Sequence, residues 1–290
     1  MSVPPTISLD ALLARYDGFL VDAYGVLLDR SGALPGAAAL LARLDALGKP
    51  WLVMTNAASR APAMLAAEFA TVGLPIPPER ILTAGALLQA HLARAGLVGA
   101  PCLVLGPPEA QDEVARAGGY VLSPQAADDA VALIVADQKG VCWPDDVDTA
   151  LSLALRRYDA GEPLPLILCN PDLVYPLAPG RFGLTAGSIA TLIEAVLHAR
   201  YPERRPEFAR LGKPHAPMFD AACRQLNVAR PVMLGDQLDT DIRGALDYGL
   251  DAVLVGTGLA PRGDPATWPV RPTWWLESLV GGPEVRASDS

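Results

Sequence analysis

The sequence contains no long hydrophobic run and has a shortage of positive charge, and each excludes a class of protein. No apolar run approaches the roughly 18 residues that a membrane-spanning helix needs. The opening stretch MSVPPTISLDALLARYDG lacks the basic-then-apolar order of a signal peptide. We therefore expect a cytoplasmic protein that does not act on a membrane. With 23 Lys and Arg against 32 Asp and Glu, we also expect no nucleic-acid partner, because such affinity comes largely from cations on phosphates.

Cysteine and histidine are also scarce. The four cysteines are widely spaced and form no CxxC pair, so we expect buried, reduced thiols rather than disulfides or a zinc site; they are Cys102, Cys142, Cys169 and Cys223. None of the three histidines has the paired spacing of a metal site, and we treat all of them as structural or surface residues.

The 290 residues are 51% hydrophobic, which is enough to bury a large core in one elaborate domain or two modest ones. Helix and strand patterns alternate at both ends of the chain. In the N-terminal part, we expect helices over 8–16 and 34–49, and strands at 19–21 and 51–54. In the C-terminal part, we expect helices over 216–227 and 241–249, and strands at 231–234 and 251–256. Successive strand, helix and strand segments predict an α/β fold with a parallel sheet.

Polar residues follow three of these strands. Asp22 ends the first strand, Thr55 and Asn56 end the second, and Asp236 follows a third with Asp241 close behind. The carboxyl ends of parallel strands form the ligand crevice of an open sheet, so we expect these side chains to converge there. Any one such Asp is often only a turn former or a helix cap, but the combination favours a site.

The order of these residues resembles the four motifs of the haloacid dehalogenase superfamily of aspartate-nucleophile phosphohydrolases. The motifs are Asp22-x-Tyr24-Gly25, Thr55-Asn56, Gly212-Lys213-Pro214, and Gly235-Asp236 followed by Thr240-Asp241. The segment between the second and third motifs is similar to the large α/β cap of the nitrophenyl-phosphatase and nucleotide-monophosphatase branch, subclass IIA. The resemblance implies a Rossmann-like core from residues 1–84 and 205–290, with a cap domain inserted at 85–204.

The resemblance also implies an Mg²⁺-dependent phosphatase of small phosphorylated substrates. Asp22 is the expected nucleophile, which forms an aspartyl phosphate. Asp22 and Asp236 suit Mg²⁺, which takes a few carboxylate oxygens and keeps several waters. Tyr24 is expected to reach the ion through its backbone carbonyl. Asp241 is expected either to bind the ion directly or to orient a water on it.

The remaining motif residues are expected to hold the phosphate. Lys213 would offset the negative charge of Asp22 and of the phosphate. Thr55 and Asn56 would donate hydrogen bonds to phosphate oxygens, helped by backbone N–H groups at the following helix start.

Tyr24 stands where the phosphatases of this superfamily carry a second acid, which protonates the leaving oxygen. General acid-base help is worth about 10²–10⁴ in rate, and a phenol is a poor substitute for a carboxyl group. We therefore expect slow turnover that favours leaving groups needing no proton, such as aryl phosphates, acyl phosphates and anhydrides.

Two other functions remain open from the sequence. The nucleophile motif also resembles that of the true 2-haloacid dehalogenases, whose departing halide needs no acid; we favour the phosphatase because the Asp236 and Asp241 pattern belongs to metal-dependent members. Loss of the second acid is also one route to a protein that binds a phosphorylated ligand without turnover.

The cap segment supplies fewer clues. Asn170 and Asp172 form a polar turn that either faces the site, with Asp172 as a substitute acid, or is only a strand-end turn whose Asp accepts backbone N–H bonds. The run at 187–197 predicts a helix whose first N–H groups reach the substrate. An apolar cap surface would make a homodimer plausible.

Overall fold

The computed structural model describes residues 3–178, 180–261 and 263–280. Within these residues the chain forms two compact units. The first unit comprises residues up to 54, then 66–81, and the residues from 222 onward; the second comprises 55–65 and 82–221. Each unit is built on its own parallel sheet, so the expected α/β fold is confirmed. The domain boundaries expected at 84/85 and 204/205 stay a prediction.

The six-stranded sheet carries the strand patterns found at both ends of the chain. Its strand order is β15-β14-β13-β1-β4-β5. β1 lies between β13 and β4 and is parallel to both. The strands are β1 (Gly18–Asp22), β4 (Trp51–Thr55), β5 (Ile81–Thr83), β13 (Pro231–Gly235), β14 (Asp251–Val255) and β15 (Trp274–Leu276). All five residues of β1 are buried, which explains why its sequence shows no polar alternation.

Of the helices that accompany this sheet, the one at 62–71 was not expected from the sequence, and the others agree with the expected ranges apart from two differences. They are α1 (Leu9–Arg15), α2 (Ala37–Ala46), α3 (Pro62–Thr71), α8 (Ala216–Leu226) and α9 (Arg243–Tyr248). Ser8 caps α1 by accepting a hydrogen bond from Ala11 N at 3.2 Å. α2 begins at Ala37 rather than at 34, because Gly36 takes a left-handed conformation with φ of 86°. α9 begins only at Arg243, after a π-helical turn at Leu238–Ile242 that contains Asp241. A short hairpin of β2 (Leu28–Asp29) and β3 (Gly32–Ala33) follows β1.

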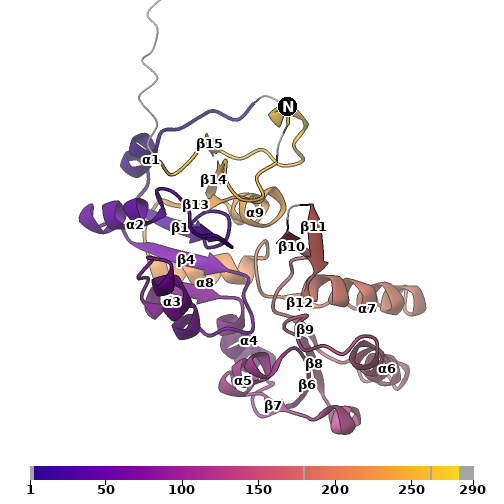
Figure 1. The fold of residues 1–290 in the computed structure, drawn as a ribbon. Coiled ribbons are helices and arrows are strands. Elements are labelled where there is room, and N and C mark those ends of the chain that lie inside the picture. Colours follow the sequence, from indigo (N-terminus) through magenta and orange to yellow (C-terminus); the bar gives the residue numbers. More distant parts are fainter. Residues whose placement is uncertain (1–2, 179, 262, 281–290) are drawn as a thin grey trace, which may run out of the picture. The chain divides into compact units, whose positions relative to one another are not determined.

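The second unit contains a five-stranded parallel sheet covered by helices on both faces (Figure 1). Its strand order is β12-β9-β8-β6-β7, from β6 (Pro101–Leu105), β7 (Tyr120–Val121), β8 (Ala132–Val135), β9 (Leu166–Leu168) and β12 (Ala209–Arg210). α6 (Asp145–Asp159) and α7 (Ala186–Arg200) bury their apolar sides on one face, and α4 (Leu88–Ala95) and α5 (Pro108–Arg116) lie on the other. An antiparallel hairpin of β10 (Val174–Ala178) and β11 (Arg181–Leu184) precedes α7. The helix expected at 187–197 is thus present and longer.

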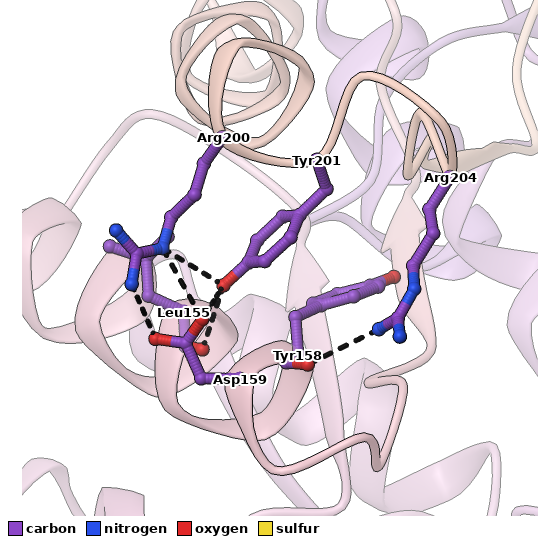
Figure 2. A network of polar contacts seen from close by, with 6 residues as sticks. All are labelled: Leu155, Tyr158, Asp159, Arg200, Tyr201 and Arg204. Carbon is purple, nitrogen blue, oxygen red and sulfur yellow. Dashed lines mark hydrogen bonds and ion pairs between the residues drawn. The ribbon is translucent and has the colours of Figure 1, made fainter.

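A surface network joins the C-terminal ends of α6 and α7 (Figure 2). Arg200 pairs with Asp159 at 2.7 Å, and the hydroxyl of Tyr201 donates to the same carboxylate at 2.7 Å. The rings of Tyr158 and Tyr201 lie 5.5 Å apart between centroids, and Arg204 donates to the carbonyl of Tyr158. The hydrogen bond from Arg200 is the main reason that the pKa of Asp159 lies below its usual value. Because the pair is exposed, it fixes the helix ends while adding little stability.

The cysteines follow expectation in part. Cys102 and Cys169 are buried free thiols, and burial raises the pKa of Cys102 to about 11 and that of Cys169 to about 12. Cys223 is half-buried, and Cys142 is exposed, contrary to the expectation. Cys142 lies in the loop before α6, where its backbone N–H donates to Asp146. Among the described residues, no helix combines the length and the apolar character needed to cross a membrane.

Candidate active site

Three buried aspartates meet at the carboxyl edge of the six-stranded sheet. Asp22 is the last residue of β1, Asp236 follows β13, and Asp241 lies in the π-helical turn. β1 and β13 are in register, with Val21 opposite Leu234, so Asp22 lies at the level of Gly235 and Asp236 comes one residue later. One carboxylate oxygen from each lies within 4.8 Å of the others, and the three residues are at most 5% exposed. An all-oxygen donor set of this kind can hold a hard divalent cation such as Mg²⁺.

Two glycines make room for the carboxylate of Asp236. Gly25 and Gly258 both have positive φ, at 93° and 56°, and a Cβ atom on either would lie 2.1 Å from Asp236 Oδ2. The same oxygen accepts a hydrogen bond from Leu259 N at 2.6 Å. Thr257 Oγ1 donates to Gly25 O at 2.5 Å and so ties the two glycine loops together. The carboxylate is therefore held by backbone atoms on two sides.

Asp241 is fixed in a similar way. Its Oδ2 accepts a hydrogen bond from Gln237 N at 3.2 Å. A Cβ atom on Gly235 would lie 2.1 Å from the Asp241 Cβ, so the glycine at the end of β13 lets this side chain fold back beside Asp236. Both acids are therefore oriented before any ligand arrives, as precise metal and substrate sites require.

Tyr24 lies in the tight turn after β1. Gly25 N donates to Leu28 O at 2.8 Å and closes this turn. Tyr24 is 38% exposed, although its two chain neighbours are buried. Tyr24 is therefore more open to solvent than the three aspartates, which are buried.

A second polar cluster lies in the second unit. Asn56, two residues beyond the buried Met54, is 7% exposed. Its Oδ1 accepts a hydrogen bond from Lys213 N at 2.7 Å, and its Nδ2 donates to Lys213 O at 3.0 Å. Nδ2 also donates to Asp172 Oδ1 at 2.8 Å. The structure thus brings together Asn56, Asp172 and the backbone of Lys213, three parts of the chain that the sequence analysis placed in separate motifs.

Thr55 and Lys213 flank this cluster and are themselves buried, at 5% and 3% exposed. Thr55 Oγ1 accepts a hydrogen bond from Ala57 N at 3.3 Å, and Thr55 O accepts one from Ala84 N at 3.0 Å. These contacts fix the backbone at the end of β4. Phosphate binding by Thr55, Asn56 and Lys213 stays a prediction.

The Asn170 turn is built as the sequence suggests. Asn170 Oδ1 accepts a hydrogen bond from Asp172 N at 3.0 Å, which closes the turn after β9. The carbonyl of Asp172 accepts from Gly187 N at 3.1 Å. The first N–H group of the predicted cap helix is therefore used by this turn. The carboxylate of Asp172 accepts from a side chain, that of Asn56.

Comparison with known proteins agrees with this arrangement. The model of the haloacid dehalogenase-like hydrolases matches residues 19–119, and that of the HAD-hydrolase-like family matches residues 210–281. The dihydroxyacetone phosphatase of Corynebacterium glutamicum is 30% identical to this chain, over 90% of this chain and 89% of its own length. The chain belongs to the haloacid dehalogenase-like hydrolases.

Two further relatives support the phosphatase branch of these hydrolases. The glycerol-3-phosphate phosphatase of Gallus gallus is 30% identical, over 93% of this chain and 92% of its own length. The structure of a possible sugar phosphatase from Cytophaga hutchinsonii has a TM-score of 0.83 and 30% identity, and covers 96% of this chain and 99% of that one. The chain is accordingly an enzyme, a phosphatase of the haloacid dehalogenase type, and the expected family is confirmed.

The sequence analysis missed several residues that shape the site of this haloacid dehalogenase-like hydrolase. Gly258 and Leu259, which hold Asp236, follow β14, where the sequence GTG after an apolar strand was a usable signal. Ser59 and Asp137, which form a hydrogen bond in the second unit, carried no sequence signal because they are far apart in the chain.

Proposed function

We propose that this phosphatase hydrolyses monoesters of small phosphorylated metabolites, with Mg²⁺ bound by Asp22, Asp236, Asp241 and the backbone carbonyl of Tyr24. The observation that carries the proposal is the meeting of three buried carboxylates within 4.8 Å at the end of β1. Three such carboxylates repel one another, and a divalent cation among them offsets that repulsion. When bound, Mg²⁺ would also reduce the repulsion between the Asp22 carboxylate and a phosphate dianion.

The first chemical step is assigned to Asp22. One of its carboxylate oxygens attacks phosphorus, and the bond from phosphorus to the ester oxygen breaks, leaving its electron pair on that oxygen. The products are an aspartyl phosphate on Asp22 and an alkoxide or phenoxide that takes up a proton. The position of Asp22, fixed at the end of a fully buried strand, supports this role because a nucleophile must be held in line with the leaving group.

The second step frees the enzyme. Water attacks phosphorus, the bond to the Asp22 oxygen breaks, and inorganic phosphate leaves with the carboxylate restored. Lys213 is assigned to offset charge on the phosphoryl group, and Thr55 to donate a hydrogen bond to it. Both steps are faster when one group donates a proton to the leaving oxygen and then accepts a proton from the attacking water. A phenol such as that of Tyr24 does this poorly. We therefore propose slow turnover with a preference for leaving groups that depart as anions.

The substrate class rests on the relatives. Two of them are named for phosphates of three-carbon compounds, dihydroxyacetone phosphate and glycerol 3-phosphate. We propose small phosphorylated metabolites as the substrate class, and we expect alkyl esters such as glycerol 3-phosphate to turn over more slowly than substrates whose leaving group departs as an anion.

A screen with and without Mg²⁺ tests the proposal. The panel is p-nitrophenyl phosphate, acetyl phosphate, glycerol 3-phosphate, dihydroxyacetone phosphate, a nucleoside monophosphate and 2-chloropropionate. We expect phosphate release that EDTA abolishes, and loss of activity by about 10³-fold or more in Asp22→Asn, because a carboxamide cannot act as the nucleophile. Chloride release that is insensitive to EDTA would instead identify a dehalogenase. One stoichiometric phosphorylation without a second turnover would identify a binding protein.

A further inference from the structure

We infer that two sets of side-chain hydrogen bonds, called clamps here, align residues 55–65 at the carboxyl edge of the five-stranded sheet. Ser59 and Asp137 form the first clamp, and Asn56 and Asp172 form the second with the backbone of Lys213. These four residues are therefore positioning residues. The groups that they position are Thr55 and Lys213. The inference rests on the proposed function, in which those two residues act on the phosphoryl group. All six residues belong to the second unit.

The topology of the five-stranded sheet shows why its edge can receive a segment. Along the chain the strands run β6, β7, β8, β9 and β12, whereas in space the order is β7-β6-β8-β9-β12. The order reverses between β6 and β8. In open parallel sheets the ligand crevice lies at such a switch point, outside the carboxyl ends of the strands. The residues that follow β6 and β8 are therefore the place to look for a bound group.

The first clamp is at this switch point. Ser59 Oγ donates a hydrogen bond to Asp137 Oδ2, and Asp137 lies two residues after the end of β8. The other oxygen of Asp137 accepts from Lys139 N at 3.0 Å, which orients the carboxylate. Ser59 is 8% exposed. A hydroxyl from the protein's own chain thus takes the position where a ligand would bind in a sheet of this topology.

The second clamp lies after β9 and β12. The side-chain oxygen of Asn56 accepts a hydrogen bond from Lys213 N, and its side-chain nitrogen donates one to Lys213 O. The Asn56 amide thus pairs with the backbone of Lys213 as the peptide group of a neighbouring strand would. The second N–H of the amide goes to Asp172 Oδ1 at 2.8 Å. A side-chain amide has two N–H donors, and both are used here. Asn56 therefore acts on the phosphoryl group through Lys213.

Gly212 shows how closely the second clamp is packed. A Cβ atom on this residue would lie 2.5 Å from Asn56 Oδ1 and 2.9 Å from Cys169 O. Gly212 N donates to the same Cys169 carbonyl at 3.2 Å, which aligns the chain beside β9 just before Lys213. The glycine is thus needed for the approach of Asn56, and the clamp fixes where the Lys213 side chain leaves the backbone.

The clamp also assigns a role to Asp172. Its Oδ1 accepts from Asn56, so it orients an amide rather than delivering a proton to a leaving group. A carbonyl oxygen can accept the same bond, so Asp172→Asn should preserve the clamp and Asp172→Ala should break it. A general acid would be lost in both variants, because neither Asn nor Ala can donate an acidic proton. These two variants separate the roles.

The test measures kcat and KM of the full-length enzyme with p-nitrophenyl phosphate and with glycerol 3-phosphate. Asn56→Asp removes both hydrogen bonds that the Asn56 amide donates and places a second carboxylate against that of Asp172. We therefore expect kcat to fall about 100-fold on both substrates, which is the loss that misplacement of a catalytic group can cause. Asp172→Ala should lower kcat on both substrates together, and Asp172→Asn should restore most of it. Asn227→Asp, which adds the same charge at an exposed site, is the matched control.

Hydrogen exchange gives a readout that needs no activity. Lys213 N–H is bonded to Asn56 Oδ1, so its exchange should be at least about 10-fold faster in Asn56→Ala than in the wild type or in Asp172→Asn. Unchanged exchange in Asn56→Ala would overturn the inference. So would a fall of kcat in Asp172→Asn confined to glycerol 3-phosphate, which would mark Asp172 as the acid. Absence of Mg²⁺-dependent phosphatase activity in the wild type would overturn the proposed function, and the exchange data would still judge the second clamp.

Discussion

Asp236 lies so close to Gly25 that no side chain fits between them. A Cβ atom on Gly25 would lie 2.1 Å from Asp236 Oδ2 and 2.4 Å from its carboxyl carbon. The glycine after Tyr24 is therefore part of the carboxylate site and is more than a turn residue. The distance also shows how the first and last motifs of the chain, more than 200 residues apart, depend on each other.

Gly25→Ala should accordingly weaken the metal site. The added methyl group must displace the Asp236 carboxylate, so we expect the Mg²⁺ concentration for half-maximal activity to rise at least about 10-fold, as for other changes that disturb metal ligands. Gly48→Ala is the matched control, since Gly48 also has positive φ, at 63°, but has nothing within 4 Å of the added atom. Both substitutions strain the backbone, because alanine adopts a positive φ less readily than glycine does. Equal Mg²⁺ dependence in the two would contradict the assigned site.

Under the proposed function, Tyr24→Asp should supply the proton donor that Tyr24 provides poorly. We expect kcat on glycerol 3-phosphate to rise by about 10²–10⁴, the usual value of general acid-base help. kcat on p-nitrophenyl phosphate should change little, because nitrophenolate leaves without a proton. Tyr24→Phe is the companion variant, and we expect it to match the wild type because a phenol is a poor proton donor to a leaving oxygen. Identical kcat on the alkyl ester in wild type and Tyr24→Asp would remove Tyr24 as the cause of slow turnover.

The carboxylate cluster was predictable from the sequence because each of its members is marked locally. Asp22 and Asp236 each follow an uninterrupted apolar run, and parallel strands bring such ends to one edge whatever their distance in the chain. Helix ends were less predictable. The start of α2 depends on the positive φ of Gly36, which the neighbouring Leu34 and Pro35 do not reveal.

The contacts of the Asn56 cluster could not be predicted from the sequence, for a different reason. Asn56 lies 157 residues from Lys213 and 116 from Asp172, and each of the three has a plausible role alone. Only the fold shows that both N–H donors of the Asn56 amide are used in hydrogen bonds within the protein. Ser59 and Asp137 are similar, since a Ser in a loop and an Asp after a strand carry no signal of each other.

Glu194 should be a main determinant of stability in the second unit. This residue of α7 is 7% exposed; its Oε1 accepts from Phe208 N at 2.7 Å and its Oε2 pairs with Arg210. Removing one partner leaves the other charge poorly solvated, so Glu194→Ala should lower the free energy of unfolding by about 3–5 kcal/mol. Urea unfolding measures this.

Two comparisons make the Glu194 prediction specific. Glu194→Gln keeps an acceptor for Phe208 N and should cost less than Glu194→Ala. Arg200→Ala removes the exposed pair with Asp159 (Figure 2) and should cost less than about 1 kcal/mol, because solvent screens that pair. A cost for Glu194→Ala as small as that for Arg200→Ala would refute the buried-pair interpretation.

His215 should make stability depend on pH on the acid side. Burial, assisted by the charge of Arg210, holds the pKa of His215 below its usual value near 6.5, and Glu194 opposes this more weakly. His215 therefore binds a proton less readily in the folded state than in the unfolded state. Stability from His215 is complete above about pH 6.5 and is lost as the pH falls through the lower, folded-state pKa.

His215→Gln should flatten this part of the profile. We expect the free energy of unfolding, measured in urea at pH 8 and pH 5.5, to fall less in the variant than in the wild type, since other groups contribute equally to both. In a Glu194→Gln background the nearby Arg210 loses its counter-charge, which lowers the pKa of His215 further and should steepen the fall. If His215→Gln and wild type lost the same stability between the two pH values, the neutral state of His215 would not contribute to the fold. A fall that became shallower with Glu194→Gln would contradict the assigned influence of Glu194, because removing a nearby carboxylate can only lower the pKa of a histidine.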